Sequence, residues 1–251
     1  MLTSMQGEIP AVICPVTCRT PEEAVHFIRR LSKDHRTDII ELRLDYMWPD
    51  MTVDGLVQLC RTAKDILGEK PLIATFRTHA EGGEASITDA EYVALKCDIA
   101  KAGCASYIDV EYNRGRSVVD NILGSARVYG MKTILSTHDF QKTDSEDRLL
   151  EKLVVMKQTS PDIVKMAVMP LRPDDVLRLL SATAAMKELY PDTPLITMSM
   201  GRLGAVSRLI GGVFGSIATF AAAGHGSAPG QMQLGPMRDV LTIISEASGS
   251  A

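Results

Sequence analysis

The chain has 251 residues, of which 45% are hydrophobic and 23% are charged, and its formal net charge is −4. This composition is that of a folded globular protein, and it excludes a disordered, a collagen-like or a disulfide-dense chain. The 31 acidic residues outnumber the 27 basic ones and no basic run is longer than two, which argues against binding to nucleic acid.

The first ten residues carry no basic segment followed by an apolar one, so we expect no secretory signal. The longest uncharged apolar segment, 209–223, is shorter than a membrane span of about 20 residues and predicts a helix end joined to a buried strand. The five cysteines lack the spacing of a zinc site, and we expect reduced thiols. These features predict a cytoplasmic protein without a membrane partner.

Short apolar runs alternate with longer segments of helical period along the whole chain. Eight strands are predicted, at 11–16, 38–45, 71–76, 106–112, 132–138, 162–169, 194–200 and 215–220. The spacing is about 31 residues per unit, the length of a βα repeat, and no linker divides the chain. We therefore predict an α/β fold, a single (β/α)8 TIM barrel domain over residues 1–251. A doubly wound open sheet is the alternative, but the chain has no GxGxxG fingerprint for a dinucleotide.

Three threonines have the spacing of helix N-caps. Thr20 precedes a proline and stands three residues before a glutamate, and Thr88 and Thr143 likewise have a glutamate three residues on. In this pattern the hydroxyl and the glutamate satisfy free backbone N–H groups, so a helix is expected to begin after each threonine.

The second predicted strand carries charges on one of its two faces. Alternate residues of a barrel strand face the interior, so Glu41, Arg43 and Asp45 are expected to lie together inside. Buried charges are costly unless they pair with one another or with a ligand. An internal salt-bridge network and a functional site are both open at this point. Asp109 and Glu111 share a strand face in the same way and are expected to belong to an interior network.

A single lysine, Lys165, interrupts the apolar sixth strand. Lysine is rarely buried without a reason, and a desolvated amine is a nucleophile that forms a Schiff base with a ketone. The alternative is a lysine at a strand end that reaches solvent. Because four strand residues follow it, we favour the nucleophile.

Polar residues follow several predicted strands, where barrel enzymes place catalytic groups. His138 ends the fifth strand and is suited to acid–base work near neutral pH. Arg77 follows the third strand and suits a substrate with hydroxyls or a carboxylate, and Glu81 is placed to orient a histidine and support its cationic form. A structural histidine and a solvated turn remain the alternatives.

The last third of the chain offers further polar and apolar candidates. Arg208 lies in a helical stretch after the seventh strand, and Ser227 and Gln231 lie in a loop after the eighth that is able to close over a ligand. Met198 and Met200 are two residues apart, so their side chains lie on the same face of the strand and would form an apolar wall. Core packing explains these methionines equally well.

Taken together, these segments resemble type I 3-dehydroquinate dehydratase, the Schiff-base enzyme of the shikimate pathway. The matching segments, in the order of the family, are ELRLD at 41–45, FRTHAEGGE at 76–84, STHDF at 136–140, KMAVMP at 165–170, TMSMGRLGAVSRL at 197–209, FGSIATFAAAG at 214–224 and SAPGQ at 227–231.

The resemblance implies a (β/α)8 barrel that dehydrates 3-dehydroquinate to 3-dehydroshikimate without a metal or an organic cofactor. Lys165 would form the imine, His138 would move the protons, and Glu81 would hold the histidine. Arg208 would pair with the substrate carboxylate. The remaining substrate contacts would come from Glu41, Arg43, Arg77, Phe220, Ser227, Gln231, Met198 and Met200. A homodimer is also implied.

Two rival functions share these features. A class I aldolase or transaldolase also uses a strand lysine on a barrel, but the STHDF histidine and the SRL arginine disfavour it. A non-catalytic binding protein on the same barrel is the other, and the intact set of Lys165, His138 and Glu81 argues against it.

Overall fold

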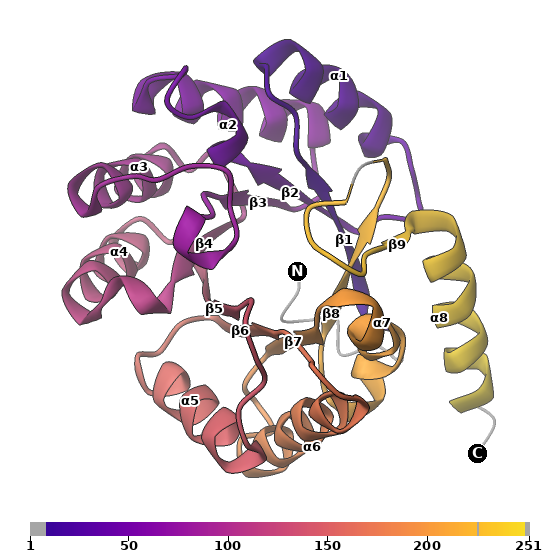
Figure 1. Ribbon diagram of the computed structural model, residues 1–251. Coiled ribbons are helices and arrows are strands. Elements are labelled where there is room, and N and C mark those ends of the chain that lie inside the picture. Colours follow the sequence, from indigo (N-terminus) through magenta and orange to yellow (C-terminus); the bar gives the residue numbers. More distant parts are fainter. Residues whose placement is uncertain (1–8, 225, 249–251) are drawn as a thin grey trace.

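The computed structural model describes residues 9–224 and 226–248, in which strands and helices alternate (Figure 1). The strands are β1 (Ala11–Val16), β2 (Ile39–Arg43), β3 (Leu72–Thr75), β4 (Tyr107–Glu111), β5 (Lys132–Asp139), β6 (Ile163–Val168), β7 (Leu195–Ser199), β8 (Ala218–Ala222) and β9 (Met232–Gln233). The α-helices are α1 (Pro21–Ser32), α2 (Val53–Leu67), α3 (Asp89–Ala102), α4 (Arg116–Val128), α5 (Glu146–Gln158), α6 (Pro173–Leu189), α7 (Gly201–Ile210) and α8 (Leu234–Ser248). Short 3-10 helices are η2 (Leu44–Met47), η3 (His79–Glu81), η4 (Tyr112–Arg114) and η5 (Gly211–Phe214).

The strands pair in parallel in the order β7-β6-β5-β4-β3-β2-β1-β8-β9, and the sheet curls into a barrel with helices around its outside (Figure 1). The barrel closes between β7 and the segment before β8, where the Ile217 N–H donates to the Leu195 carbonyl at 2.8 Å. The predicted (β/α)8 TIM barrel is confirmed. The domain range 1–251 stays a prediction, because residues 1–8, 225 and 249–251 lie outside the described part.

The eighth strand begins later than the sequence predicts. It covers 218–222 instead of 215–220, because η5 occupies 211–214 and Gly215 turns the chain with φ of 105°. A backbone of positive φ interrupts an extended strand, so the strand forms only after this turn. The expectation of a helix end joined to a buried strand over 209–223 is confirmed.

Strand parity divides the barrel interior into layers. Isoleucines or a tyrosine fill the lowest layer, as Ile39 does in β2, Tyr107 in β4 and Ile163 in β6. Two residues further along the same strands the inward side chains are Glu41, Asp109 and Lys165, all buried. The apolar layer thus seals the floor of the barrel, and the polar layers above it open toward the carboxyl ends of the strands.

Two of the three predicted N-caps are confirmed. The Thr20 hydroxyl accepts the N–H of Glu23, and Thr88 and Glu91 form the reciprocal pair. The third is wrong: α5 begins at Glu146 after Ser145, and Thr143 instead donates its hydroxyl to the Met169 carbonyl at 3.0 Å. Thr143 therefore ties the loop after β5 to the end of β6. No helix within 9–224 and 226–248 is long and apolar enough to cross a membrane.

Candidate active site

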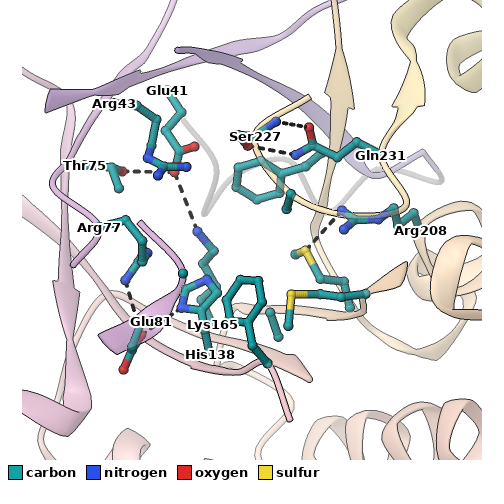
Figure 2. Close-up of a pocket in the computed structure, with 17 residues that line it drawn as sticks. Glu41, Arg43, Thr75, Arg77, Glu81, His138, Lys165, Arg208, Ser227 and Gln231 are labelled. Atoms are coloured by element: carbon teal, nitrogen blue, oxygen red, sulfur yellow. Dashed lines mark hydrogen bonds and ion pairs between the residues drawn. The ribbon is translucent and has the colours of Figure 1, made fainter. Parts of the chain in front are cut away.

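A pocket of about 440 Å³ opens at the carboxyl ends of the strands (Figure 2). All twelve site residues predicted from the sequence line it: Glu41, Arg43, Arg77, Glu81, His138, Lys165, Met198, Met200, Arg208, Phe220, Ser227 and Gln231. They come from five strands, β2, β5, β6, β7 and β8, and from the segments that follow β3, β7 and β8. The barrel therefore brings together side chains that lie up to 190 residues apart (41 to 231) in the sequence.

Lys165 lies inside the barrel, in the middle of β6, and is 4% exposed. Its Nζ is 3.3 Å from Asp109 Oδ2, 3.7 Å from Glu41 Oε1 and 4.5 Å from the centre of the Phe220 ring. The alternative of a lysine that reaches solvent at a strand end is wrong, because the inward parity of β6 directs the side chain into the pocket. The two carboxylates balance the ammonium charge, and the ring covers it.

His138 and Glu81 form a hydrogen-bonded pair beside Lys165, in which Glu81 is buried and His138 is half-buried with 10% of its side chain exposed (Figure 2). His138 lies near the end of β5 and Glu81 in η3, and His138 Nδ1 is 2.9 Å from Glu81 Oε2. Burial lowers the pKa of His138 well below its ordinary 6.5, and the Arg77 and Lys165 cations lower it further. Burial also raises the pKa of Glu81 to about 8.

These shifts act on one shared proton, because the two groups are hydrogen-bonded to each other. The directions of the two shifts place the extra proton of the pair on Glu81 and leave the imidazole neutral. The sequence instead predicted that Glu81 supports a cationic histidine, and the structure differs because desolvation and the Arg77 and Lys165 cations disfavour the charged imidazole. Above about pH 8 a carboxylate accepts Nδ1–H, and Nε2 is left bare.

Arg77 is the centre of a buried ion-pair network. Its guanidinium contacts Asp109 at 2.6 Å, Glu111 at 3.0 Å, Glu81 at 3.4 Å and the Ser136 hydroxyl at 3.1 Å. The predicted interior network of Asp109 and Glu111 is confirmed, with Arg77 as its cation. Three carboxylates around one arginine hold its pKa well above the ordinary value, so Arg77 carries its charge at any working pH.

Arg43 is fixed by a bidentate ion pair with Asp45. The guanidinium donates to the two carboxylate oxygens at 2.8 and 2.7 Å, and the same oxygens accept the N–H groups of Arg77 and Glu84 at 3.1 Å. Asp45 lies just beyond the strand, in η2, and it thereby ties the end of β2 to the segment after β3. Glu41, on the same face of β2, accepts the Thr75 hydroxyl at 3.0 Å.

Arg208 has no such partner. Its side chain reaches from α7 into the pocket, is 1% exposed, and donates to the Pro229 carbonyl at 3.2 Å and to Met198 Sδ at 3.4 Å. Its Nε has no hydrogen-bond partner, and within 9–224 and 226–248 no carboxylate forms an ion pair with it. Burial lowers its pKa from 12.5 to about 10. A buried cation that no carboxylate neutralises is suited to an anionic ligand.

The loop after β8 covers the pocket. The Ser227 N–H donates to Gln231 Oε1 at 2.8 Å, and Gln231 Nε2 donates to the Ser227 hydroxyl at 3.0 Å (Figure 2). The Gly201 N–H donates to the Pro229 carbonyl at 3.1 Å, which joins the loop to the start of α7. Met198, Met200 and Phe220 form an apolar wall below it. The polar loop and the apolar wall together suit a small, partly polar ring.

Across 9–224 and 226–248, no three His, Cys, Asp or Glu residues are grouped in a way that could hold a metal ion.

A comparison with known protein families decides the identity of this barrel. The sequence profile of the family described as Type I 3-dehydroquinase matches residues 12–248. The chain belongs to the type I 3-dehydroquinase family. The family and the enzyme class expected from the sequence are thereby confirmed, and the aldolase alternative is set aside.

Relatives of this 3-dehydroquinase family member agree in sequence and in structure. A 3-dehydroquinate dehydratase of Salmonella paratyphi B is 41% identical over 210 residues, which cover 84% of this chain and 83% of the relative. The type I 3-dehydroquinate dehydratase of Clostridium difficile, solved with covalently modified comenic acid, superposes with a TM-score of 0.91 at 34% identity and covers 95% of this chain and 94% of its own. The 3-dehydroquinate dehydratase of Geobacillus kaustophilus superposes with a TM-score of 0.90 at 31% identity. The match covers 95% of this chain and 92% of the Geobacillus chain.

Sequence reasoning missed five residues that line the pocket of this 3-dehydroquinase, namely Thr75, Gly82, Phe140, Ala167 and Ala228. Strand parity would have found Thr75 and Ala167, which share the inward faces of β3 and β6 with other site residues. Phe140 and Gly82 depend on each other, because a Cβ on Gly82 would lie 2.2 Å from the Phe140 ring. No local signal in the sequence predicts that contact, since it joins the segments after β3 and β5.

Proposed function

We propose that this member of the type I 3-dehydroquinase family dehydrates 3-dehydroquinate to 3-dehydroshikimate, the third step of the shikimate pathway, through an imine on Lys165. The observation that supports this most directly is the content of one pocket: a buried amine, a proton-carrying pair and a buried cation that no carboxylate of the described residues neutralises. The amine can react with a ketone of the substrate, the pair can remove a proton from an acidic C–H bond, and the cation can bind a carboxylate.

Lys165 attacks the substrate ketone, and loss of water gives a protonated imine. The imine withdraws electrons from the adjacent carbon, so a C–H bond there becomes acidic. Nε2 of His138 takes that proton while Nδ1 remains bonded to Glu81. The resulting enamine expels the hydroxyl group at the next carbon, which leaves as water with the proton that His138 returns. Hydrolysis of the product imine frees Lys165.

The charged walls of the pocket bind the substrate in one orientation. Arg208 pairs with the carboxylate, which supplies the anion that the buried guanidinium lacks in the protein. Glu41, Arg43 and Arg77 contact the ring hydroxyls. Ser227 and Gln231 close the loop over the ring, against Phe220, Met198 and Met200. Fixing the ring in this way holds the reacting C–H bond at the imidazole.

Borohydride trapping tests the imine. Wild-type protein is mixed with 3-dehydroquinate, reduced, and examined by intact mass and peptide mapping. We expect a stable adduct on the peptide that contains Lys165, and none on the Lys165→Met variant. Lys96→Met is the matched control, because Lys96 is equally buried but lies on α3 outside the pocket, and it should still form the adduct. Turnover without an adduct would keep the reaction and reject the imine, and neither turnover nor adduct would reject both.

We also propose that the chain works as a homodimer in the cytoplasm, as the resemblance to the family implies. Apolar side chains on neighbouring elements support the dimer: Leu203 and Val206 on α7 and Val213 on η5 are 45%, 46% and 68% exposed. Light scattering on the eluting peak of a size-exclusion column measures the molar mass directly. A mass close to that of one chain, 27.3 kDa, would contradict the dimer.

A further inference from the structure

Asn113 lies behind the His138–Glu81 pair, outside the pocket. It belongs to η4, directly after β4, and its side chain is exposed to solvent on one side. On the other side its Nδ2 donates to Glu81 Oε1 at 2.7 Å and to the Thr137 hydroxyl at 3.2 Å. No pocket motif includes this residue, yet it forms the shortest hydrogen bond to Glu81.

The two oxygens of Glu81 have different partners. Oε2 faces His138 Nδ1 at 2.9 Å and Arg77 Nη1 at 3.4 Å, whereas Oε1 accepts from Asn113. An amide nitrogen only donates, so Oε1 cannot point a proton at Asn113 while this bond is in place. The exchangeable proton of the pair is therefore confined to the line between Oε2 and Nδ1. A donor on Oε1 also stabilises the carboxylate relative to the carboxylic acid.

The form of Glu81 decides what His138 is able to do. When Glu81 is a carboxylate, it accepts Nδ1–H, and Nε2 is bare and able to take a proton from the substrate. When the pair holds its extra proton, Nε2 carries a hydrogen and acts as the acid. Any group that favours the carboxylate form of Glu81 therefore favours the form of His138 that acts as a base.

We propose, on the basis of the function proposed above, that Asn113 is a positioning residue for the reaction. Its amide aims Oε2 of Glu81 at Nδ1 of His138 and favours the carboxylate, so that Nε2 of His138 is bare when the substrate imine forms. Thr137, on β5 beside His138, fixes the amide in this orientation.

Other charged groups face the pair from every strand around it, and none of them is altered by a change at Asn113. They are Arg43 and Glu41 of β2, Arg77 after β3, Asp109 and Glu111 of β4, and Lys165 of β6. Asn113 also borders a surface hollow lined by Tyr112, Arg116 and Val119.

The variants Asn113→Leu and Asn113→Asp test the proposal, with Asn121→Leu as the matched control. Asn121 is an exposed asparagine on α4 whose Oδ1 accepts the Cys97 thiol at 3.9 Å. The readouts are kcat and KM across pH 5.5–9.5, and ¹⁵N spectra of the histidine side chains across the same range. The signal of His138 is assigned by its loss in His138→Gln.

Asn113→Leu removes the donor, so the pair keeps its extra proton to a higher pH. We expect the acid limb of kcat to move up by about one pH unit and kcat at pH 7 to fall roughly tenfold, because a hydrogen bond to a charged group is worth about that much. KM should change by less than about twofold. Asn113→Asp adds a negative charge and should move the limb further. Asn121→Leu should match the wild type.

An Asn113→Leu enzyme with the kcat, the pH profile and the His138 ¹⁵N titration of the wild type would overturn the proposal. A fall in kcat that is equal at every pH, with an unchanged ¹⁵N titration, would also overturn it, because such a fall is a structural effect. The ¹⁵N titration needs no substrate. It therefore judges Asn113 even if the wild type fails to convert 3-dehydroquinate, which is the separate failure of the proposed function.

Discussion

Replacing Arg208 by methionine should make the protein more stable and its substrate binding weaker. The guanidinium is 1% exposed and unpaired by any carboxylate in the described part of the chain, so the folded protein bears the cost of desolvating it. Its pKa falls from 12.5 to about 10 on folding. At about 1.4 kcal/mol for each pH unit, this corresponds to a cost of about 3 kcal/mol.

Methionine fills a similar volume without a charge, so most of this cost disappears. The variant loses the hydrogen bonds to the Pro229 carbonyl and to Met198 Sδ, each worth about 0.5–1.5 kcal/mol. We therefore expect the free energy of unfolding of Arg208→Met to rise by about 1–2 kcal/mol. Substrate binding loses a buried charge pair, and a rise in KM of about 100-fold, equivalent to about 2.7 kcal/mol, is expected.

Urea unfolding followed by fluorescence measures the stability, since the single tryptophan, Trp48, packs edge-on against Phe76 with ring centres 5.9 Å apart. Steady-state kinetics with 3-dehydroquinate measures KM. The control is Arg178→Met, an arginine on α6 that is paired with Asp174 and Asp175 near the surface. The control should lose less than about 1 kcal/mol of stability and keep its KM.

The reasoning would be refuted by an Arg208→Met protein that is less stable than the wild type and has an unchanged KM. Such a result would make the arginine a packing residue rather than the site of an anion. A stability gain without a change in KM would keep the burial argument and move the carboxylate elsewhere in the pocket.

Three further predictions concern the proton carrier, a buried lysine and a strained turn. His138→Ala should still give the borohydride adduct but lower kcat by about a hundredfold or more, and near-normal kcat would remove the histidine from its role. Lys96→Met should raise the free energy of unfolding at pH 7 by about 3 kcal/mol, because burial lowers the pKa of Lys96 from 10.5 to about 8. The folded lysine loses its proton before the unfolded one, so the wild type gains stability as pH rises from about 8 to 10.5. The stability advantage of Lys96→Met over the wild type should therefore vanish above about pH 10.5. A difference in urea midpoint that stays constant with pH would contradict this account. Gly82→Ala should destabilise the protein by about 2 kcal/mol more than Gly103→Ala and lower kcat. Both glycines have positive φ, but a Cβ on Gly82 would lie 2.2 Å from the Phe140 ring, whereas a Cβ on Gly103 would meet nothing within 4 Å. Equal losses of stability in thermal denaturation would show that the Phe140 ring moves aside freely.

The sequence by itself determined the alternation of strands and helices and the face on which the charged residues of β2 lie. Side chains alternate along a strand with a period of two, which is a local rule, so Glu41 and Arg43 were placed inside with certainty once β2 was recognised. The apolar run around Lys165, with four strand residues after it, indicated that its side chain stays away from solvent. The carboxyl ends of parallel strands meet at one rim, and this was enough to gather His138, Arg77 and Glu81 into one site.

Only the tertiary structure decided which of these groups pair with one another. Lys165 contacts Asp109, 56 residues away, and Arg77 contacts Glu111, 34 residues away, because the register between strands brings those layers level. The alternation of side chains along β4 did not show whether Asp109 contacts Lys165 or belongs only to the ion-pair network. Among the described residues no carboxylate pairs with Arg208, which is likewise a property of the folded pocket, and no pattern in the sequence reports it.

Local chain geometry that depends on distant contacts was also beyond the sequence. The spacing of Thr143 and Glu146 matches a capping box, but the Met169 carbonyl takes the threonine hydroxyl, and the helix begins after Ser145. Asn113 carries no sequence signal because its partner, Glu81, lies 32 residues earlier in another turn. Periodicity is set by neighbours along the chain and can be read from them, whereas hydrogen-bond partners across the barrel are set by the curvature and register of the whole sheet.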